Sequence, residues 1–121
     1  KNVEVRVIAE KGRVTDIWPY YHWSGLEEYF RDRVDLKKLR QDYLSKYVAT
    51  VSRELGKIAE YASIIARAGE LASYSWSIDF ARVNGEWYFI DMALAEASWK
   101  PEKRLNEDIA LREKLRSIVG S

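Results

Sequence analysis

The segment 77–91, with the sequence SIDFARVNGEWYFID, limits the possible folds of this chain more than any other stretch. It consists of two short apolar runs joined by Asn84-Gly85. Asn-Gly favours a tight hairpin turn, because both residues tolerate the positive φ that such turns require. The sequence therefore predicts two antiparallel strands paired with each other, over residues 74–83 and 86–92.

Each of these two strands carries one aspartate among apolar neighbours, Asp79 in the first strand and Asp91 in the second. Aspartate is a residue that strands disfavour, and two of them on paired strands can face a common point. Such a point suits Mg²⁺, a hard cation that prefers carboxylate oxygens. The alternative is that each aspartate is simply a strand residue that faces solvent.

The N-terminal part of the chain predicts a second hairpin. Residues 3–9 alternate between valine and other side chains in a stretch rich in β-branched residues, which indicates a strand. Lys11-Gly12 marks a turn, and residues 13–18 are typical of the returning strand, which ends at Pro19.

The hydrophobic period changes in the middle of the chain. Apolar residues recur there at spacings of three and four, which predicts an amphipathic helix that begins with Asp35 as its N-cap. The apolar face comprises Leu36, Leu39, Tyr43, Tyr47, Val51, Leu55, Ile58, Ala62 and Ile65. We expect either one long helix or a break near residues 46–49, and a stop at Ala68-Gly69.

A final helix is expected after Pro101. Its apolar positions are Leu105, Ile109, Leu111, Leu115 and Ile118. The order of elements is therefore β-β-α-β-β-α, and hairpins pair antiparallel strands. The sequence predicts an α+β fold, with a four-stranded antiparallel sheet and helices packed on one face.

Composition limits the classes of partner and the number of domains. At 121 residues the chain has room for one hydrophobic core, so residues 1–121 are expected to form a single domain. Because the chain begins at Lys1, we interpret it as the C-terminal part of a longer protein. Twenty basic and nineteen acidic residues leave a charge of +1, so no overall positive field attracts nucleic acid.

Cysteine usage and hydropathy add two expectations. The chain has no cysteine, which excludes disulfides and thiolate chemistry and fits a cytoplasmic protein. No apolar run approaches the ~20 residues of a membrane span, so no membrane partner is expected.

The arrangement of these residues resembles a known superfamily. The strand Glu4-Val5-Arg6-Val7, the turn at Gly12, the amphipathic helix and the two Asp-bearing strands are similar to the C-terminal lobe of an ATP-grasp enzyme. The similarity spans roughly residues 3–95. It is greatest to divergent branches that include the cell-division-cycle type and viral or archaeal relatives.

The resemblance implies an activity and a site. It assigns contact with the terminal phosphates of ATP to Arg6, and ligation of Mg²⁺ to Asp79 and Asp91. Enzymes of this superfamily activate a carboxylate substrate as an acyl phosphate, which an amine or another nucleophile then attacks. An N-terminal lobe supplies the lysines and the adenine contacts, so we expect the isolated chain to be inactive without that lobe.

The chain departs from the family pattern at two positions of the metal site. Asp91 stands where family members usually carry glutamate, and Ala93 stands where they usually carry asparagine. Loss of the amide removes one metal ligand or one orienting hydrogen bond. Glu96 is close enough in sequence to substitute for it, and its alternative role is that of an ordinary surface glutamate.

The remaining aromatic and titratable residues allow functional and structural interpretations. His22, the only histidine, could act as an acid or base, but a histidine between aromatic residues is more often a packing or interface residue. An aromatic cluster could stack on a base or sugar, or could pack under the helix or against a missing lobe. Its members are Trp18, Tyr20, Tyr21 and Trp23. Under the second function that the sequence allows, a non-catalytic protein-interaction module, the carboxylates are incidental and the aromatic loop is a partner surface.

Overall fold

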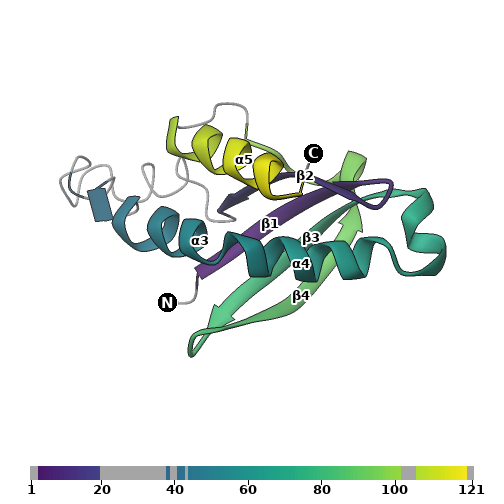
Figure 1. Cartoon of the computed structure of the whole chain (residues 1–121), viewed down its shortest axis with the longest axis horizontal. Coiled ribbons are helices and arrows are strands. Elements are labelled where there is room, and N and C mark those ends of the chain that lie inside the picture. The colour runs from purple at the N-terminus through teal and green to yellow at the C-terminus, as the bar shows by residue number, and fades with distance from the viewer. Residues whose placement is uncertain (1–2, 20–37, 39–40, 43, 102–105, 120–121) are drawn as a thin grey trace.

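The computed structural model describes residues 3–19, 38, 41–42, 44–101 and 106–119 (Figure 1). The strands are β1 (Val3–Glu10), β2 (Arg13–Pro19), β3 (Ser75–Val83) and β4 (Glu86–Leu94). The α-helices are α3 (Ala49–Arg53), α4 (Leu55–Ala66) and α5 (Asn106–Val119). Short helical turns occur at Leu44–Val48, Gly69–Ser73 and Ala95–Ala97.

The four strands form one antiparallel sheet in the order β2-β1-β3-β4. Both predicted hairpins are present, and β1 pairs with β3 to join them side by side. The hairpin turns have consecutive residues with positive φ, at Lys11-Gly12 and at Asn84-Gly85. This left-handed backbone suits two-residue hairpins, so the prediction of an α+β fold with four antiparallel strands is confirmed.

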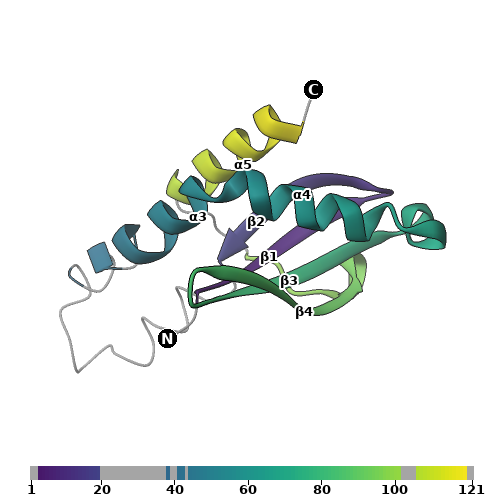
Figure 2. The same cartoon turned by 60° about the horizontal axis from the view of Figure 1, so that its bottom comes forward.

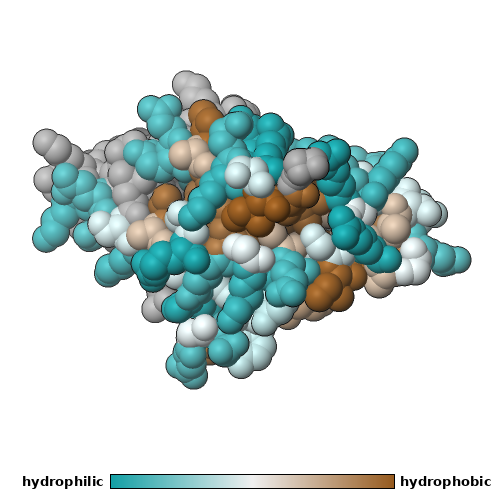
Figure 3. Space-filling model, in the orientation of Figure 1, coloured by the Kyte–Doolittle hydropathy of each residue, from teal (hydrophilic) through white to brown (hydrophobic). Residues whose placement is uncertain are grey.

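The described helices lie on one face of the sheet (Figure 2). Successive side chains of a strand point to opposite faces, and in β1 Val5 and Val7 point towards the helices. They pack in one core with buried residues of α4 and α5 such as Leu55, Ile58 and Leu115. Figure 3 shows a strip of apolar side chains along the seam between α4 and α5 on this helical side.

The long helical segment is interrupted twice. Residues Leu44–Val48 form a π-helical turn, close to where a break was predicted, and a second break lies at Glu54, between α3 and α4. The Glu54 carboxylate accepts hydrogen bonds from Arg82 Nε (2.7 Å), Arg82 Nη2 (2.9 Å) and Trp87 Nε1 (2.7 Å). This cluster connects the break in the helix to the Asp-bearing hairpin.

The ends of the helices agree with the sequence in part. α4 ends at Ala66, and Gly69 has a φ of +52°, so the predicted stop is confirmed. In α5, Leu115 is fully buried, whereas Ile118 of the predicted apolar face is 46% exposed. The predicted N-cap Asp35 lies outside the described residues, together with Leu36, Leu39, Tyr43 and Leu105.

No helix among the described residues has both the length and the apolar character that a membrane span requires.

Candidate functional site

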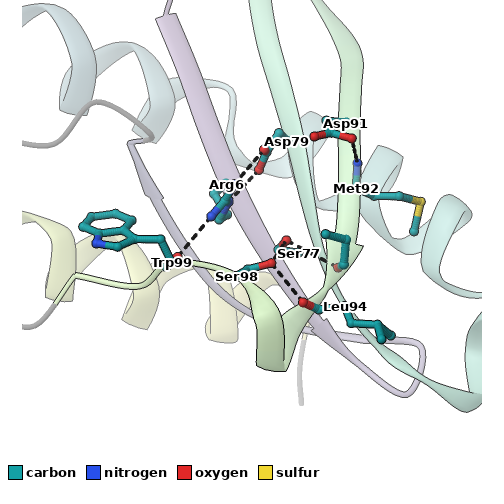
Figure 4. Close-up of polar contacts among 9 residues, drawn as sticks. Arg6, Ser77, Asp79, Asp91, Met92, Leu94, Ser98 and Trp99 are labelled. Carbon is teal, nitrogen blue, oxygen red and sulfur yellow. Dashed lines mark hydrogen bonds and ion pairs between the residues drawn. The ribbon is translucent and has the colours of Figure 1, made fainter.

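Arg6, Asp79 and Asp91 occupy one row across the sheet. Arg6 of β1 is the register partner of Asp79 in β3, and Asp79 is the register partner of Asp91 in β4. Residues that face each other across paired strands project from the same side of the sheet. The three side chains therefore lie on the face opposite the helices, where Figure 4 shows the two carboxylates on neighbouring strands. The two aspartates therefore share one face of their paired strands, and Arg6 lies on that face beside Asp79.

A β-bulge in β4 is responsible for the orientation of Asp91. The register passes from Asp79↔Asp91 to Phe80↔Phe89, so Ile90 is the extra residue. In a regular strand, residues 89 and 91 would point to the same face. The bulge instead lets Phe89 share the helical side with Phe80, its edge-to-face neighbour at 6.5 Å, while Asp91 shares the opposite side with Asp79. Bulges often re-aim a side chain in this way.

Arg6 and Asp79 form a buried, bidentate ion pair. Arg6 Nε donates to Asp79 Oδ1 at 2.9 Å, and Arg6 Nη2 donates to Asp79 Oδ2 at 3.0 Å. Arg6 is 7% exposed and Asp79 is 3% exposed. Parallel hydrogen bonds of this kind fix the plane of the guanidinium as well as its charge. The pair therefore holds β1 and β3 together at the centre of the row.

Asp91 lies in a different environment at the end of the row. Its side chain is exposed, and its Oδ1 accepts a hydrogen bond of 2.9 Å from the backbone N–H of Met92. One carboxylate of the predicted metal site is thus open to solvent, while the other is buried against an arginine.

Residues 95–101 cross the face of the sheet that carries this row, beyond the end of β4 (Figure 4). We call them the crossing segment. The Ser98 hydroxyl donates to the Leu94 carbonyl at 2.9 Å and shares a hydrogen bond of 2.6 Å with the Ser77 hydroxyl. Arg6 Nη1 donates to the Trp99 carbonyl at 3.1 Å. The segment therefore lies directly over β3 and β1.

Trp18 of β2 lies on the same face of the sheet as Arg6 and packs against the crossing segment. It is the register partner of Arg6, is 1% exposed, and meets the Trp99 ring edge-on with a centroid separation of 6.5 Å. For Trp18 the structure favours packing over base stacking, although the packing is against the crossing segment and not under a helix. His22, Tyr20, Tyr21 and Trp23 lie outside the described residues.

Asp79 and Asp91 are the two carboxylates of this row, and Asp79 is already paired with Arg6 through both of its oxygens. Among the residues that the structure describes, no group of three or more His, Cys, Asp or Glu side chains is arranged to hold a metal ion. Ala93 is the register partner of Ser77 on the same face and offers no side-chain ligand. Glu96 is exposed in the turn Ala95–Ala97 and does not complete such a group with Asp79 and Asp91.

Comparison of the chain with family models, with curated proteins and with solved structures finds no match. The function is therefore inferred from the sequence and from the geometry of this site.

Proposed function

We propose that this chain is the C-terminal, Mg-ATP-binding lobe of an ATP-grasp ligase, in which an N-terminal lobe completes the active site. The observation that carries the proposal is the row of Arg6, Asp79 and Asp91 on the face opposite the helices. Three adjacent strands each contribute one residue in the order that the resemblance implies, with Asp91 at the position where family members usually carry glutamate.

A magnesium ion would meet two different carboxylates in this row: Asp91 is open to solvent, whereas both oxygens of Asp79 accept hydrogen bonds from Arg6, which the ion would have to replace. Mg²⁺ is commonly held by one or two carboxylates, and substrate phosphates and water complete its coordination. Asp79 and Asp91 would hold the ion, which supplies charge neutralisation to the phosphates when it is bound. Among the described residues no third acidic side chain joins them, and a site completed by phosphates and water does not require one. Ala93 offers no amide oxygen at the position where family members usually carry asparagine.

The role of Arg6 follows from the shape of its side chain. A guanidinium presents a planar fork of donors that matches phosphate oxygens. Phosphoryl transfer depends mainly on positioning and charge stabilisation, so no nucleophilic serine or cysteine is needed from this chain. Arg6 would orient the terminal phosphates while a carboxylate substrate, held between the two lobes, accepts the phosphoryl group.

A non-catalytic interaction module is the second candidate, and the β4 strand favours it. β4 is the last strand of the described sheet, and four of its large apolar residues are between 40% and 55% exposed. They are Tyr88, Phe89, Ile90 and Leu94. An apolar, unpaired edge strand is a common contact surface for another chain. Under this function the Arg6–Asp79 pair only stabilises the sheet, and Asp91 binds nothing.

Manganese titration by NMR separates the two candidates. The ¹⁵N-labelled chain is titrated with small amounts of MnCl₂ in the presence of ADP, because paramagnetic broadening detects even weak binding. We expect the amide signals of residues 79 and 91 to broaden first, and the Asp91→Asn variant to lose this broadening. Broadening elsewhere in the chain, or broadening that Asp91→Asn leaves unchanged, contradicts the ATP-grasp proposal and favours the interaction module.

A further inference from the structure

The strand β4 has an outer edge that no described strand covers. In the described sheet it pairs only with β3, and Figure 1 shows it along one border of the sheet. Such an edge presents a row of backbone N–H and C=O groups to a further strand. Side chains hydrogen-bond to the backbone at Met92, Ala93 and Leu94 but not, among the described residues, within 86–90. The part of the edge that is open to pairing is therefore residues 86–90.

Exposed apolar side chains lie on both sides of this strand. Phe89 is 49% exposed on the helical side, together with Leu94 at 40%, and Tyr88 is 55% exposed on the opposite side. A helix laid on one face of the sheet would cover only one of these sides. A strand added beside β4 extends both faces at once and pairs the backbone groups of the edge. The pattern of exposure therefore favours an extended segment as the occupant.

The other edge of the described sheet is less open to an added strand. β2 ends in Pro19, which has no N–H to donate. The Thr15 carbonyl accepts a hydrogen bond of 3.1 Å from Arg116 Nε of α5, and the Ile17 N–H donates to Asp16 Oδ1 at 2.8 Å. Part of the β2 backbone is thus already engaged by side chains, so we expect a strand to add at β4.

The charge of the β4 edge discriminates between extended partners. Residues 83–99 carry three acidic side chains and no basic one, in a chain whose net charge is +1. The three are Glu86, Asp91 and Glu96. A second copy would bring the same acidic segment alongside, and like charges across paired strands are destabilising. Charge therefore favours a basic partner over pairing of β4 with another β4.

We propose that residues 86–90 accept, as a further strand, an extended segment of another protein in which apolar and basic residues alternate. Its apolar side chains lie on the helical side, beside Phe89. Its lysines or arginines lie on the opposite side, near Glu86 and the ring of Tyr88, where both the carboxylate and the ring attract a cation. This inference stands apart from the proposed metal site, because none of these three residues belongs to that site.

An octapeptide of alternating lysine and valine is the probe for this edge. The ¹⁵N-labelled chain is titrated with it by NMR, at low ionic strength and without metal. We expect saturable shifts concentrated at residues 86–92 and slower hydrogen exchange at alternate amides of β4. The matched peptide of alternating glutamate and valine should bind roughly threefold to tenfold more weakly. No saturable shift in β4 at millimolar peptide, or shifts that lie mainly on α4 or α5, overturns the proposal.

Reversal of one charge on β4 tests how the basic side chains are recognised. Glu86→Lys should weaken binding of the lysine peptide and strengthen binding of the glutamate peptide, each by roughly threefold to tenfold. Glu113→Lys, at an exposed glutamate of α5, changes the net charge equally and should leave both affinities nearly unchanged. The melting temperature of each variant is the control for folding. Equal effects of the two substitutions would mean attraction to the charge of the whole chain and would overturn a specific site at this edge.

Two N-methylated peptides test strand addition on the wild-type chain, so this test does not depend on the folding of a variant. In an added strand, alternate residues direct their backbone groups to the neighbouring strand, so either the lysines or the valines pair with β4. One lysine–valine peptide is methylated at its valine nitrogens and the other at its lysine nitrogens, which leaves charge and sequence the same. We expect only one of the two to lose binding. If both peptides bind alike, side chains alone make the contact and the added strand is contradicted.

Discussion

The buried ion pair between Arg6 and Asp79 makes a quantitative prediction about stability. In Asp79→Asn the amide has nearly the same shape as the carboxylate, but the Arg6 charge stays buried without a counter-charge. Removing one partner of a buried ion pair costs about 3–5 kcal/mol in the free energy of unfolding. In contrast, Asp91 is exposed, so Asp91→Asn should change that free energy by less than about 0.5 kcal/mol.

These values convert to a large difference in melting temperature. With ~2.1 cal/mol/K of unfolding entropy per residue over 121 residues, the entropy of unfolding is about 250 cal/mol/K. Asp79→Asn should therefore lower the melting temperature by about 12–20 °C, measured by circular dichroism at neutral pH, and Asp91→Asn by no more than about 2 °C. The variant Arg6→Met/Asp79→Leu, which removes both charges, should recover most of the loss. A decrease below about 4 °C for Asp79→Asn would refute the buried pair.

Three further predictions concern the ligand, the acid stability and the core. The isolated chain should bind Mg-ATP weakly or not at all in titration calorimetry, because the adenine and lysine contacts belong to another lobe; micromolar binding would contradict the two-lobe proposal. Hydrogen bonds from Arg82, with a smaller contribution from Trp87, hold the pKa of Glu54 below its ordinary value of 4.5. The stabilisation from Glu54 is therefore fully present above pH ~4.5 and is lost as the pH falls through its lowered pKa. The difference in denaturant midpoint between the wild type and Glu54→Gln should shrink below that pH, and a constant difference from pH 7 to pH 3 would be inconsistent with this assignment. Leu115→Ala should lower the free energy of unfolding, measured with urea, by about 2–5 kcal/mol, and Ile118→Ala should lower it by less than about 1 kcal/mol. The reason is that the Leu115 side chain is 0% exposed and the Ile118 side chain is 46% exposed. Equal losses of stability in the two variants would contradict the packing of α5.

The sequence was sufficient for the four strands, for the pairing of the two hairpins and for the approximate positions of α4 and α5. Both turns contain a glycine in a position that requires positive φ, at Gly12 and Gly85, and local turn chemistry of this kind is encoded within a few residues. The change from a period of two to spacings of three and four located the helices. The exposure of Ile118 was missed, because Val119 and not Ile118 continues the face of α5 on which Leu111 and Leu115 pack against the core.

The site could be predicted only in part from the sequence. Alternation counted from the buried Trp87 places Asp91 on the helical face, and only the bulge at Ile90 brings it to the side of Asp79. Regular alternation would place the charged Asp91 on the apolar face of the sheet, and this inconsistency could have indicated the bulge. The cover supplied by Ser98 and Trp99 depends on contacts with residues distant in sequence, for which no local pattern exists.

The most direct test of the metal role of Asp91 is ATP-dependent turnover by the protein in which this chain is joined to its proposed N-terminal lobe. Wild-type protein is compared with its Asp91→Asn variant at saturating Mg-ATP, with the melting temperature of both recorded as the control for folding. We expect Asp91→Asn to abolish turnover without changing the melting temperature, because the substitution removes a metal ligand and little packing. An Asp91→Asn protein that remains folded and keeps its ATPase or ligase activity would contradict the assignment of this row as a Mg-ATP site.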